Sequence, residues 1–123
     1  MNRVLLVEDH AAFRQALAKI FESETDLEAG AQAGSLTEVR RRTGRLDGID
    51  VAIVDLSLPD GDGTDLVREL SEAGSGIPVL VLTESRDRER HARALGAGAY
   101  EVLTKDVSVK EIIAEARRMG NGK

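Results

Sequence analysis

The chain has 123 residues, contains no cysteine and carries a formal net charge of −5 at pH 7. This length suits one domain with a single core, the lack of cysteine excludes disulfides and thiolate metal sites, and the acidic balance argues against binding of a nucleic-acid backbone by this domain. Apolar runs of only a few residues and an N-terminus without the layout of a signal peptide argue against a membrane span, so we expect a cytoplasmic protein.

Short apolar runs alternate with segments of helical periodicity along the chain. The runs predict strands at residues 3–7, 27–33, 51–54, 78–82 and 100–103. They are continuous rather than alternating, which is typical of strands that are buried on both faces of a sheet. The intervening segments predict helices around residues 13–20, after Ser35, from Gly63, over residues 86–95 and from Val109. Glu38 stands three residues after Ser35, as a capping box requires.

Strands that alternate with helices in this way imply right-handed crossovers and a parallel sheet with helices on both faces. We therefore predict an α/β fold with one doubly wound, five-stranded parallel sheet. A single domain is predicted to cover residues 1–119. Residues 120–123 are predicted to form a tail or the start of a linker.

Polar side chains follow four of the five predicted strands. The first strand is followed by Glu8 and Asp9, the third by Asp55, the fourth by Thr83, and the fifth by Thr104 and Lys105. In open α/β sheets, ligands bind outside the carboxyl ends of the strands, at the point where the strand order reverses. If the strand order is 2-1-3-4-5, these side chains gather along one edge of the sheet.

This group of side chains suits a phosphoryl site. Three carboxylates crowded together repel one another unless a cation lies among them, and Mg²⁺ is the usual hard cation for oxygen ligands. Lys105 adds a fixed positive charge and Thr83 adds a hydroxyl donor. Asp55 would attack phosphorus as a carboxylate nucleophile, while the metal and Lys105 offset the charge on the equatorial oxygens.

The whole chain resembles a receiver domain of bacterial two-component response regulators. The motifs are Glu8–Asp9 after VLLV, Asp55 in VDLSLPDGDG with Pro59 four and Gly63 eight residues on, Thr83 in VLVLT, and Lys105 in LGAGAYEVLTKD. The resemblance implies a flavodoxin-like (βα)5 fold with the strand order 2-1-3-4-5. The AGA segment before the fifth strand and the Lys105–Asp106 pair look most like the branch whose full-length members carry a LuxR-type helix-turn-helix.

The resemblance also implies a role for each site residue. Asp55 would accept a phosphoryl group from a sensor histidine kinase, and the domain would catalyse only its own phosphorylation and dephosphorylation. The implied Mg²⁺ ligands are Glu8, Asp9, Asp55 and the backbone carbonyl of Ser57, and the implied phosphoryl ligands are Thr83 and Lys105. The face made by the fourth helix, fifth strand and fifth helix would then control output, with transcription regulated through an output domain outside these residues. Partners would be the kinase and a second copy in a phosphorylation-dependent homodimer, without nucleic-acid or membrane contact by this domain.

Two positions depart from the pattern of the family. Glu84 directly follows Thr83, where the family often has a small residue. Val102 stands three residues before Lys105, where the family usually has a Tyr or Phe that acts as a rotamer switch. Tyr100 has the same strand parity as Val102, and we interpret it as an ordinary strand aromatic. Because Val102 is too short to replace a ring, we predict that the inactive and active states differ less than in relatives.

Other functions fit parts of the pattern. A stand-alone single-domain response regulator that acts by protein contact has the same site and stays an alternative. A flavin-binding module of similar topology needs backbone amides for a phosphate and aromatics against the ring, and neither is evident. An aspartate-nucleophile phosphatase needs a second acid two residues after Asp55, where this chain has Ser57. A calcium-binding loop at PDGDGTD would have Asp65 at the position that requires glycine and Ser71 at the position that requires a bidentate glutamate. The sequence therefore does not fit a calcium-binding loop.

Simpler roles exist for single residues. Helix capping would account for the position of Asp9, Asp60 or Asp62 if each residue is considered separately. It does not explain the set, since Lys105 and Thr83 stand at the ends of other strands. His10, beside the acidic pair, is interpreted as an exposed residue at the start of a helix, and His91, in the fourth helix, is interpreted as a surface residue.

Overall fold

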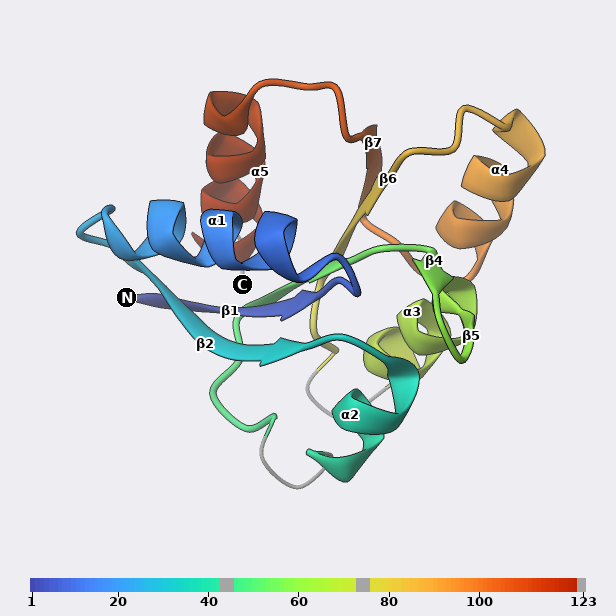
Figure 1. Cartoon of the computed structure of the whole chain (residues 1–123), viewed down its shortest axis with the longest axis horizontal. Coiled ribbons are helices and arrows are strands. Elements are labelled where there is room, and N and C mark those ends of the chain that lie inside the picture. The colour runs from blue at the N-terminus through green and yellow to red at the C-terminus, as the bar shows by residue number, and fades with distance from the viewer. Residues whose placement is uncertain (43–45, 73–75, 122–123) are drawn as a thin grey trace.

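The computed structural model describes residues 1–42, 46–72 and 76–121. Within these ranges, strands and helices alternate along the chain (Figure 1). The elements are β1 (Asn2–Val7), α1 (Ala11–Glu22), β2 (Leu27–Ala33), α2 (Leu36–Arg41), β3 (Val51–Val54), β4 (Ser57–Leu58), β5 (Gly61–Asp62), α3 (Gly63–Glu72), β6 (Val79–Thr83), α4 (Arg88–Gly96), β7 (Glu101–Thr104) and α5 (Val109–Asn121). No helix in this part of the chain is both long enough and apolar enough to cross a membrane.

Five strands form one parallel sheet in the order β2-β1-β3-β6-β7. The predicted five-stranded parallel sheet is thus confirmed, and its strands, numbered among themselves along the chain, lie in the order 2-1-3-4-5. The remaining strands, β4 and β5, pair antiparallel in a hairpin directly after β3. This hairpin was not predicted, because strands of two residues carry no readable periodicity.

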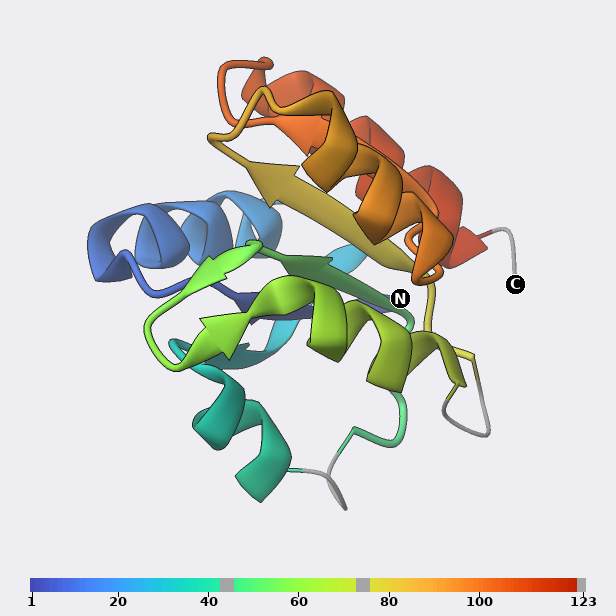
Figure 2. The same ribbon diagram turned by 90° about the vertical axis from the view of Figure 1, so that its right-hand side faces the viewer.

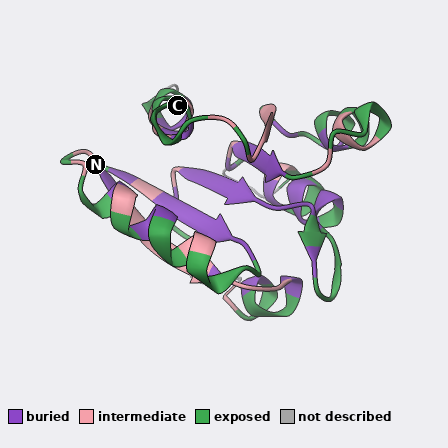
Figure 3. Ribbon diagram, turned by 45° about the horizontal axis from the view of Figure 1, so that its top comes forward, coloured by how far each residue is buried: buried purple, intermediate pink, exposed green. Residues whose placement is uncertain are grey.

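Helices cover both faces of the sheet, and the strands between them are largely buried (Figure 3). Phe21 of α1 and Ile112 of α5 pack on one face. Val39 of α2, Leu66 of α3 and Ala94 of α4 pack on the other, where Figure 2 shows α3 and α4 in front of the sheet. Every residue of β3 and β6 is buried, which explains why the apolar runs of these strands are continuous.

Two predicted boundaries shift for local chemical reasons. β6 begins at Val79 rather than Pro78, because proline has no N–H to donate to the sheet. α4 begins at Arg88 rather than two residues earlier, because the Asp87 side chain accepts a hydrogen bond from the Glu89 N–H at 3.0 Å and caps the helix.

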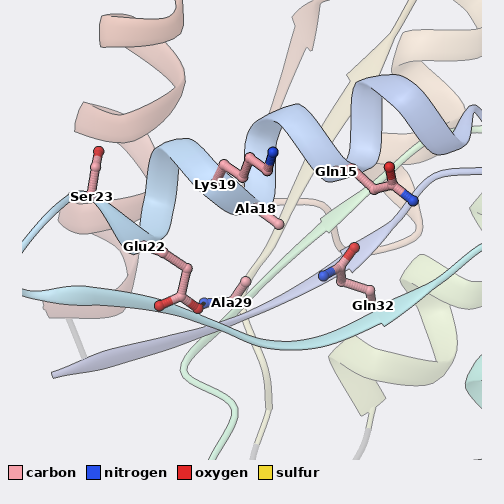
Figure 4. A pocket seen from close by; sticks show the side chains of 7 residues that line it. All are labelled: Gln15, Ala18, Lys19, Glu22, Ser23, Ala29 and Gln32. Atoms are coloured by element: carbon pink, nitrogen blue, oxygen red, sulfur yellow. Dashed lines mark hydrogen bonds between the residues drawn. The ribbon is translucent and has the colours of Figure 1, made fainter.

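Strand β2 lies at one edge of the sheet and borders an open groove along α1 (Figure 4). The pairing of β2 with β1 is irregular between Val4 and Leu5, whose partners are Ala29 and Ala31. The Glu22 carboxylate accepts a hydrogen bond from the Ala29 N–H at 3.0 Å. An irregular edge with an occupied amide is a poorer template for another strand than a regular, free edge.

Helix α5 extends through Asn121, which corrects the prediction that residues 120–123 form a tail. Gly120 is buried, and the side-chain carbonyl of Asn121 accepts a hydrogen bond from Asn2 Nδ2 at 2.8 Å. A Cβ atom at Gly120 would lie 2.9 Å from the Asn2 side chain, so glycine is what allows α5 to approach β1 here. The packed helix therefore continues past the predicted domain limit at residue 119, whereas residues 122 and 123 of the predicted tail lie outside the described residues.

Candidate functional site

A cleft of about 280 Å³ opens at the carboxyl edge of the sheet. Its lining residues come from the segments that follow β1, β3, β6 and β7: Glu8, Asp9, His10, Asp55, Ser57, Glu84 and Lys105. The parallel strands point their carboxyl ends at this edge, so residues far apart in the chain meet there. Five of the six predicted site residues line the cleft, and Thr83 does not.

Three carboxylates meet in the cleft. Glu8, Asp9 and Asp55 each offer an oxygen atom, and these three atoms lie within 4.8 Å of one another. Glu8 and Asp55 are only 5% and 6% exposed, whereas Asp9 is exposed. Carboxylates that are buried this close together favour a bound cation over three free charges, so the donor set suits a hard divalent metal ion.

Lys105 joins two of these carboxylates. Its Nζ lies 2.5 Å from Glu8 Oε1 and 3.0 Å from Asp55 Oδ2, and it stands 5.1 Å from the centre of the Phe13 ring. The backbone of the lysine is held by a hydrogen bond from its N–H to the Thr83 carbonyl at 2.8 Å. One ammonium cannot neutralise three carboxylates, so the cleft keeps an excess of negative charge.

The charges in the cleft shift the ionisation of two of its groups. Burial raises the pKa of Glu8 above its ordinary value, against the opposing effect of the hydrogen bond from Lys105. Burial alone would lower the pKa of Lys105, but its hydrogen bonds to Glu8 and Asp55 outweigh burial, so that the pKa is raised. Lys105 therefore stays charged at neutral pH. Because burial disfavours the charged form of Glu8, a nearby cation stabilises this carboxylate more than it would stabilise an exposed one.

The Asp55 carboxylate is held in one orientation. Its Oδ1 atom accepts a hydrogen bond from the Ser57 N–H at 3.1 Å, and its Oδ2 atom accepts one from Lys105. Gly63 lets α3 begin directly beside this residue, since a Cβ atom there would lie 2.3 Å from the Asp55 carbonyl oxygen. The Gly63 N–H donates to the Leu56 carbonyl at 2.8 Å. The glycine is thus required for close backbone approach.

Thr83 is not among the residues that line the cleft. Its side chain is buried, and its hydroxyl oxygen accepts a hydrogen bond from the Ser85 N–H at 3.1 Å. The next residue, Glu84, is exposed and lines the cleft. The hydrogen bond from Ser85 uses the Thr83 hydroxyl as an acceptor, so its hydrogen is still available for donation to another group.

Tyr100 directly precedes β7, so it lies at the opposite end of this strand from the cleft. Tyr100 is 55% exposed, its hydroxyl oxygen accepts a hydrogen bond from Arg118 at 3.1 Å, and the Arg118 guanidinium stands 5.3 Å from the ring centre. Val102 packs against the apolar cluster shared with α2, α3 and α4. Among the described residues that line the cleft there is no aromatic ring.

Two contacts of α4 were missed by the sequence reasoning. His91 is half-buried rather than exposed, and its Nε2 atom lies 2.6 Å from the Ser85 carbonyl oxygen. Arg90 donates a hydrogen bond to the Ser57 hydroxyl at 3.1 Å. His91 is thus a partly covered surface residue with one backbone contact. No local pattern signals these contacts, because they depend on how the loop after β6 folds back onto the helix.

The residues considered as helix caps have different roles. The N-cap residue of α1 is His10, whose side chain makes no capping hydrogen bond, so Asp9 is not explained as a cap. Asp62 accepts a hydrogen bond from the Thr64 N–H at 2.9 Å, in the first turn of α3. His10 itself is exposed, as predicted.

Asp60 binds α2, which lies earlier in the chain, rather than the helix that follows it. Its two carboxylate oxygens accept hydrogen bonds from the N–H groups of Leu36 and Thr37, both at 2.9 Å, and from the Thr37 hydroxyl at 2.6 Å. The predicted Ser35 cap is also present, with its hydroxyl accepting from the Glu38 N–H at 3.1 Å. The β4–β5 hairpin beside the cleft is thereby fastened to α2.

We expect Asp60→Ala to destabilise the fold in a pH-dependent way. The hydrogen bonds from Thr37 and Leu36 lower the pKa of Asp60 to about 2, whereas an unfolded aspartate titrates near pH 4. A lowered folded-state pKa contributes stability above the unfolded value, and this contribution is lost as the pH falls toward 2. Urea unfolding should show a less stable variant at pH 7 and a difference from the wild type that shrinks between pH 4 and pH 2. Asp47→Ala, at an exposed position, is the control; a difference that stays constant with pH would contradict this explanation.

Comparison with known proteins agrees with this arrangement. The family model of the response regulator receiver domain matches residues 4–117. The chain is 32% identical over 123 residues to the DNA-binding transcriptional activator DevR/DosR of Mycobacterium tuberculosis, covering 100% of this chain and 56% of that protein. It is 35% identical over 125 residues to the KDP operon transcriptional regulatory protein KdpE of Escherichia coli, covering 95% of this chain and 50% of that protein. The chain thus spans about half the length of these curated relatives.

A solved structure shows the same fold over nearly the whole chain. The beryllofluoride-activated NtrC4 receiver domain dimer matches with a TM-score of 0.85 and 28% identity, covering 99% of this chain and 98% of that chain. The family model covers almost every element from β1 to α5, including those that form the cleft. The protein therefore belongs to the response regulator receiver domain family.

Proposed function

We propose that this domain accepts a phosphoryl group on Asp55 from the phosphohistidine of a sensor histidine kinase, in a step that requires Mg²⁺. The observation that carries the proposal is the joint placement of Asp55, two further carboxylates and Lys105 in one cleft. A carboxylate that is oriented, partly neutralised and open to a cleft is suited to act as a nucleophile toward phosphorus.

The groups of the domain and of the donor histidine account for every bond and proton in this transfer. A carboxylate oxygen of Asp55 attacks phosphorus, the new O–P bond forms, and the P–N bond to the donor histidine breaks. The donor imidazole leaves with the electron pair of that bond and takes up a proton there. Lys105 already contacts Asp55 Oδ2 at 3.0 Å, so its ammonium lies beside the group that becomes the acyl phosphate. Its charge offsets the charge on the transferred oxygens.

Glu8, Asp9, Asp55 and the backbone carbonyl of Ser57 would hold the magnesium ion. The three carboxylate oxygens within 4.8 Å of one another support this assignment, because Mg²⁺ prefers oxygen ligands and keeps several waters. When bound, the ion supplies positive charge that stabilises the phosphoryl oxygens during transfer. The Lys105 ammonium contacts Glu8 and Asp55 as well, so it competes with the ion for these two carboxylates.

The acyl phosphate would be lost by attack of water on phosphorus, so the domain catalyses only its own phosphorylation and dephosphorylation. Thr83 would turn its hydroxyl from Ser85 toward the phosphoryl group. This rearrangement would alter the face made by α4, β7 and α5, where Leu95 and Tyr100 are exposed. The face is the proposed contact for output and for a phosphorylation-dependent homodimer, and the NtrC4 receiver dimer supports the second role.

The output proposed for the whole protein is transcription regulation in the cytoplasm. It is supported by relatives named as transcriptional regulators, of which this chain spans about half. Their remaining length supports an output domain joined to the receiver. The AGA segment and the Lys105–Asp106 pair favour the branch with a LuxR-type helix-turn-helix.

Phosphorylation by a small donor tests the proposal. We expect the wild-type chain, incubated with acetyl phosphate and Mg²⁺, to gain the mass of one phosphoryl group, and to gain none when a chelator replaces the metal. Hydroxylamine should remove the added mass, as it does from an acyl phosphate. Intact-mass spectrometry follows all three results, and uptake that persists in chelator would contradict the role given to the acidic cluster.

A further inference from the structure

Helix α4 has little apolar packing to hold it in place. Of its nine residues only Ala94 is buried, and the helix has an exposed leucine, Leu95, near its end. A helix with so little buried apolar surface moves at low cost in free energy. Its position therefore depends strongly on polar contacts, and two of these come from its first turns.

Both contacts reach the loops beside the cleft. Arg90 donates to the Ser57 hydroxyl at 3.1 Å, in the segment after Asp55. His91 Nε2 lies 2.6 Å from the Ser85 carbonyl, in the segment after Thr83. A carbonyl oxygen only accepts hydrogen bonds, so Nε2 carries the hydrogen and His91 is the donor.

Ser85 is bound on both sides of its backbone. Its N–H donates to the Thr83 hydroxyl at 3.1 Å, and its carbonyl accepts from His91 at 2.6 Å. One residue thus connects the Thr83 side chain to helix α4 through two hydrogen bonds. If the Thr83 hydroxyl turns away, the Ser85 N–H loses its partner, and an unpaired amide in a half-buried segment drives the loop to rearrange.

We propose that His91 is the positioning residue that couples Thr83 to helix α4. Release of the Ser85 N–H by Thr83 moves the Ser85 carbonyl, and the bond from His91 makes α4 follow. The inference rests on the proposed function, because it is a phosphoryl group on Asp55 that draws Thr83 away. It adds a residue and a route that lie outside the cleft: His91 contacts neither the acidic cluster nor Lys105 among the described hydrogen bonds.

The chemistry of the donor defines two informative substitutions. Glutamine can extend a side-chain N–H to about the reach of Nε2, so His91→Gln preserves a donor to the Ser85 carbonyl. Leucine keeps similar bulk without a donor, so His91→Leu removes only the hydrogen bond. Arg88→Leu is the matched control, because Arg88 is exposed on the same helix and makes no side-chain hydrogen bond within the part of the chain that the structure describes.

The experiment compares the full chain with these three variants. Each ¹⁵N-labelled protein is treated with acetyl phosphate and Mg²⁺, uptake is read by intact mass, and amide chemical shifts are compared with those of the same protein before treatment. We expect all four proteins to take up one phosphoryl group. The phosphorylation-dependent shifts of residues 88–96 should fall to less than about half of the wild-type values in His91→Leu, and should be retained in His91→Gln and Arg88→Leu.

The two readouts separate failure of the inference from failure of the proposed function. If His91→Leu takes up the phosphoryl group and its α4 amides respond as in the wild type, the coupling role is overturned while the proposed function stands. A His91→Gln response as weak as that of His91→Leu also overturns it, since the donor would then not matter. If none of the four proteins takes up a phosphoryl group, the proposed function is overturned and this inference falls with it.

Discussion

Asp55→Ala is expected to take up no phosphoryl group from acetyl phosphate in the presence of Mg²⁺. The variant loses the proposed nucleophile while its neighbours Glu8 and Lys105 keep their contact at 2.5 Å. Removal of a nucleophile costs far more than removal of a supporting residue, so the rate of uptake should fall at least about 10³-fold. Intact mass measures the loss, and circular dichroism checks that the variant is folded.

Asp65→Ala is the matched control for this variant. Asp65 is an exposed aspartate on α3 that does not line the cleft, so its removal should leave uptake unchanged. Asparagine at position 55 is a weaker test, because a neighbouring acid or hydroxyl can accept in its place. Uptake by Asp55→Ala at the wild-type rate would place the acceptor at another residue.

Lys105→Met should change stability and metal affinity in opposite directions. The ammonium is 14% exposed and contacts two carboxylates that are each 7% exposed at the side chain. Removal of one partner from a buried ion pair leaves uncompensated charge, which costs about 3 kcal/mol of unfolding free energy in chelator. Without the lysine, the same carboxylates hold a divalent cation more strongly. Mg²⁺ affinity should rise roughly tenfold, which corresponds to about 1.4 kcal/mol.

Urea unfolding in chelator and calorimetric titration with Mg²⁺ measure the two effects of Lys105→Met. Because a ligand that binds only the folded state adds stability, saturating Mg²⁺ should restore part of the loss. Lys110→Met, at an exposed lysine on α5, is the control and should change neither quantity. A variant that is less stable and also binds Mg²⁺ more weakly would show that Lys105 organises the cleft instead of competing with the ion.

Much of the fold follows from patterns within single segments of the sequence. The run at Val51–Val54 predicts a strand with the observed limits, because burial on both faces requires continuous apolar residues. Ser35 and Gly63 mark the starts of α2 and α3 through their local chemistry. The positions of Glu8, Asp9, Asp55 and Lys105 at strand ends predict that they meet, because parallel strands share one carboxyl edge.

Other features depend on contacts between segments that are distant in the chain. Asp60 precedes α3 in sequence but binds the first turn of α2, more than twenty residues earlier. Helix α5 continues to Asn121, where the sequence alone suggests a tail, because that residue bonds to Asn2 at the other end of the chain. Capping and tail signals describe a segment's own preferences, and packing against a distant partner can redirect them.

The sequence by itself thus determined the sheet, its burial and the group of side chains at its edge, since these depend on periodicity and on strand polarity. Only the tertiary structure decided how the side chains are used. It placed the Thr83 hydroxyl against the Ser85 N–H, and it joined the Ser85 carbonyl to His91. The physical reason is that a hydrogen bond depends on loop path and side-chain rotamer to within a few tenths of an ångström, and neither is encoded in hydrophobic periodicity.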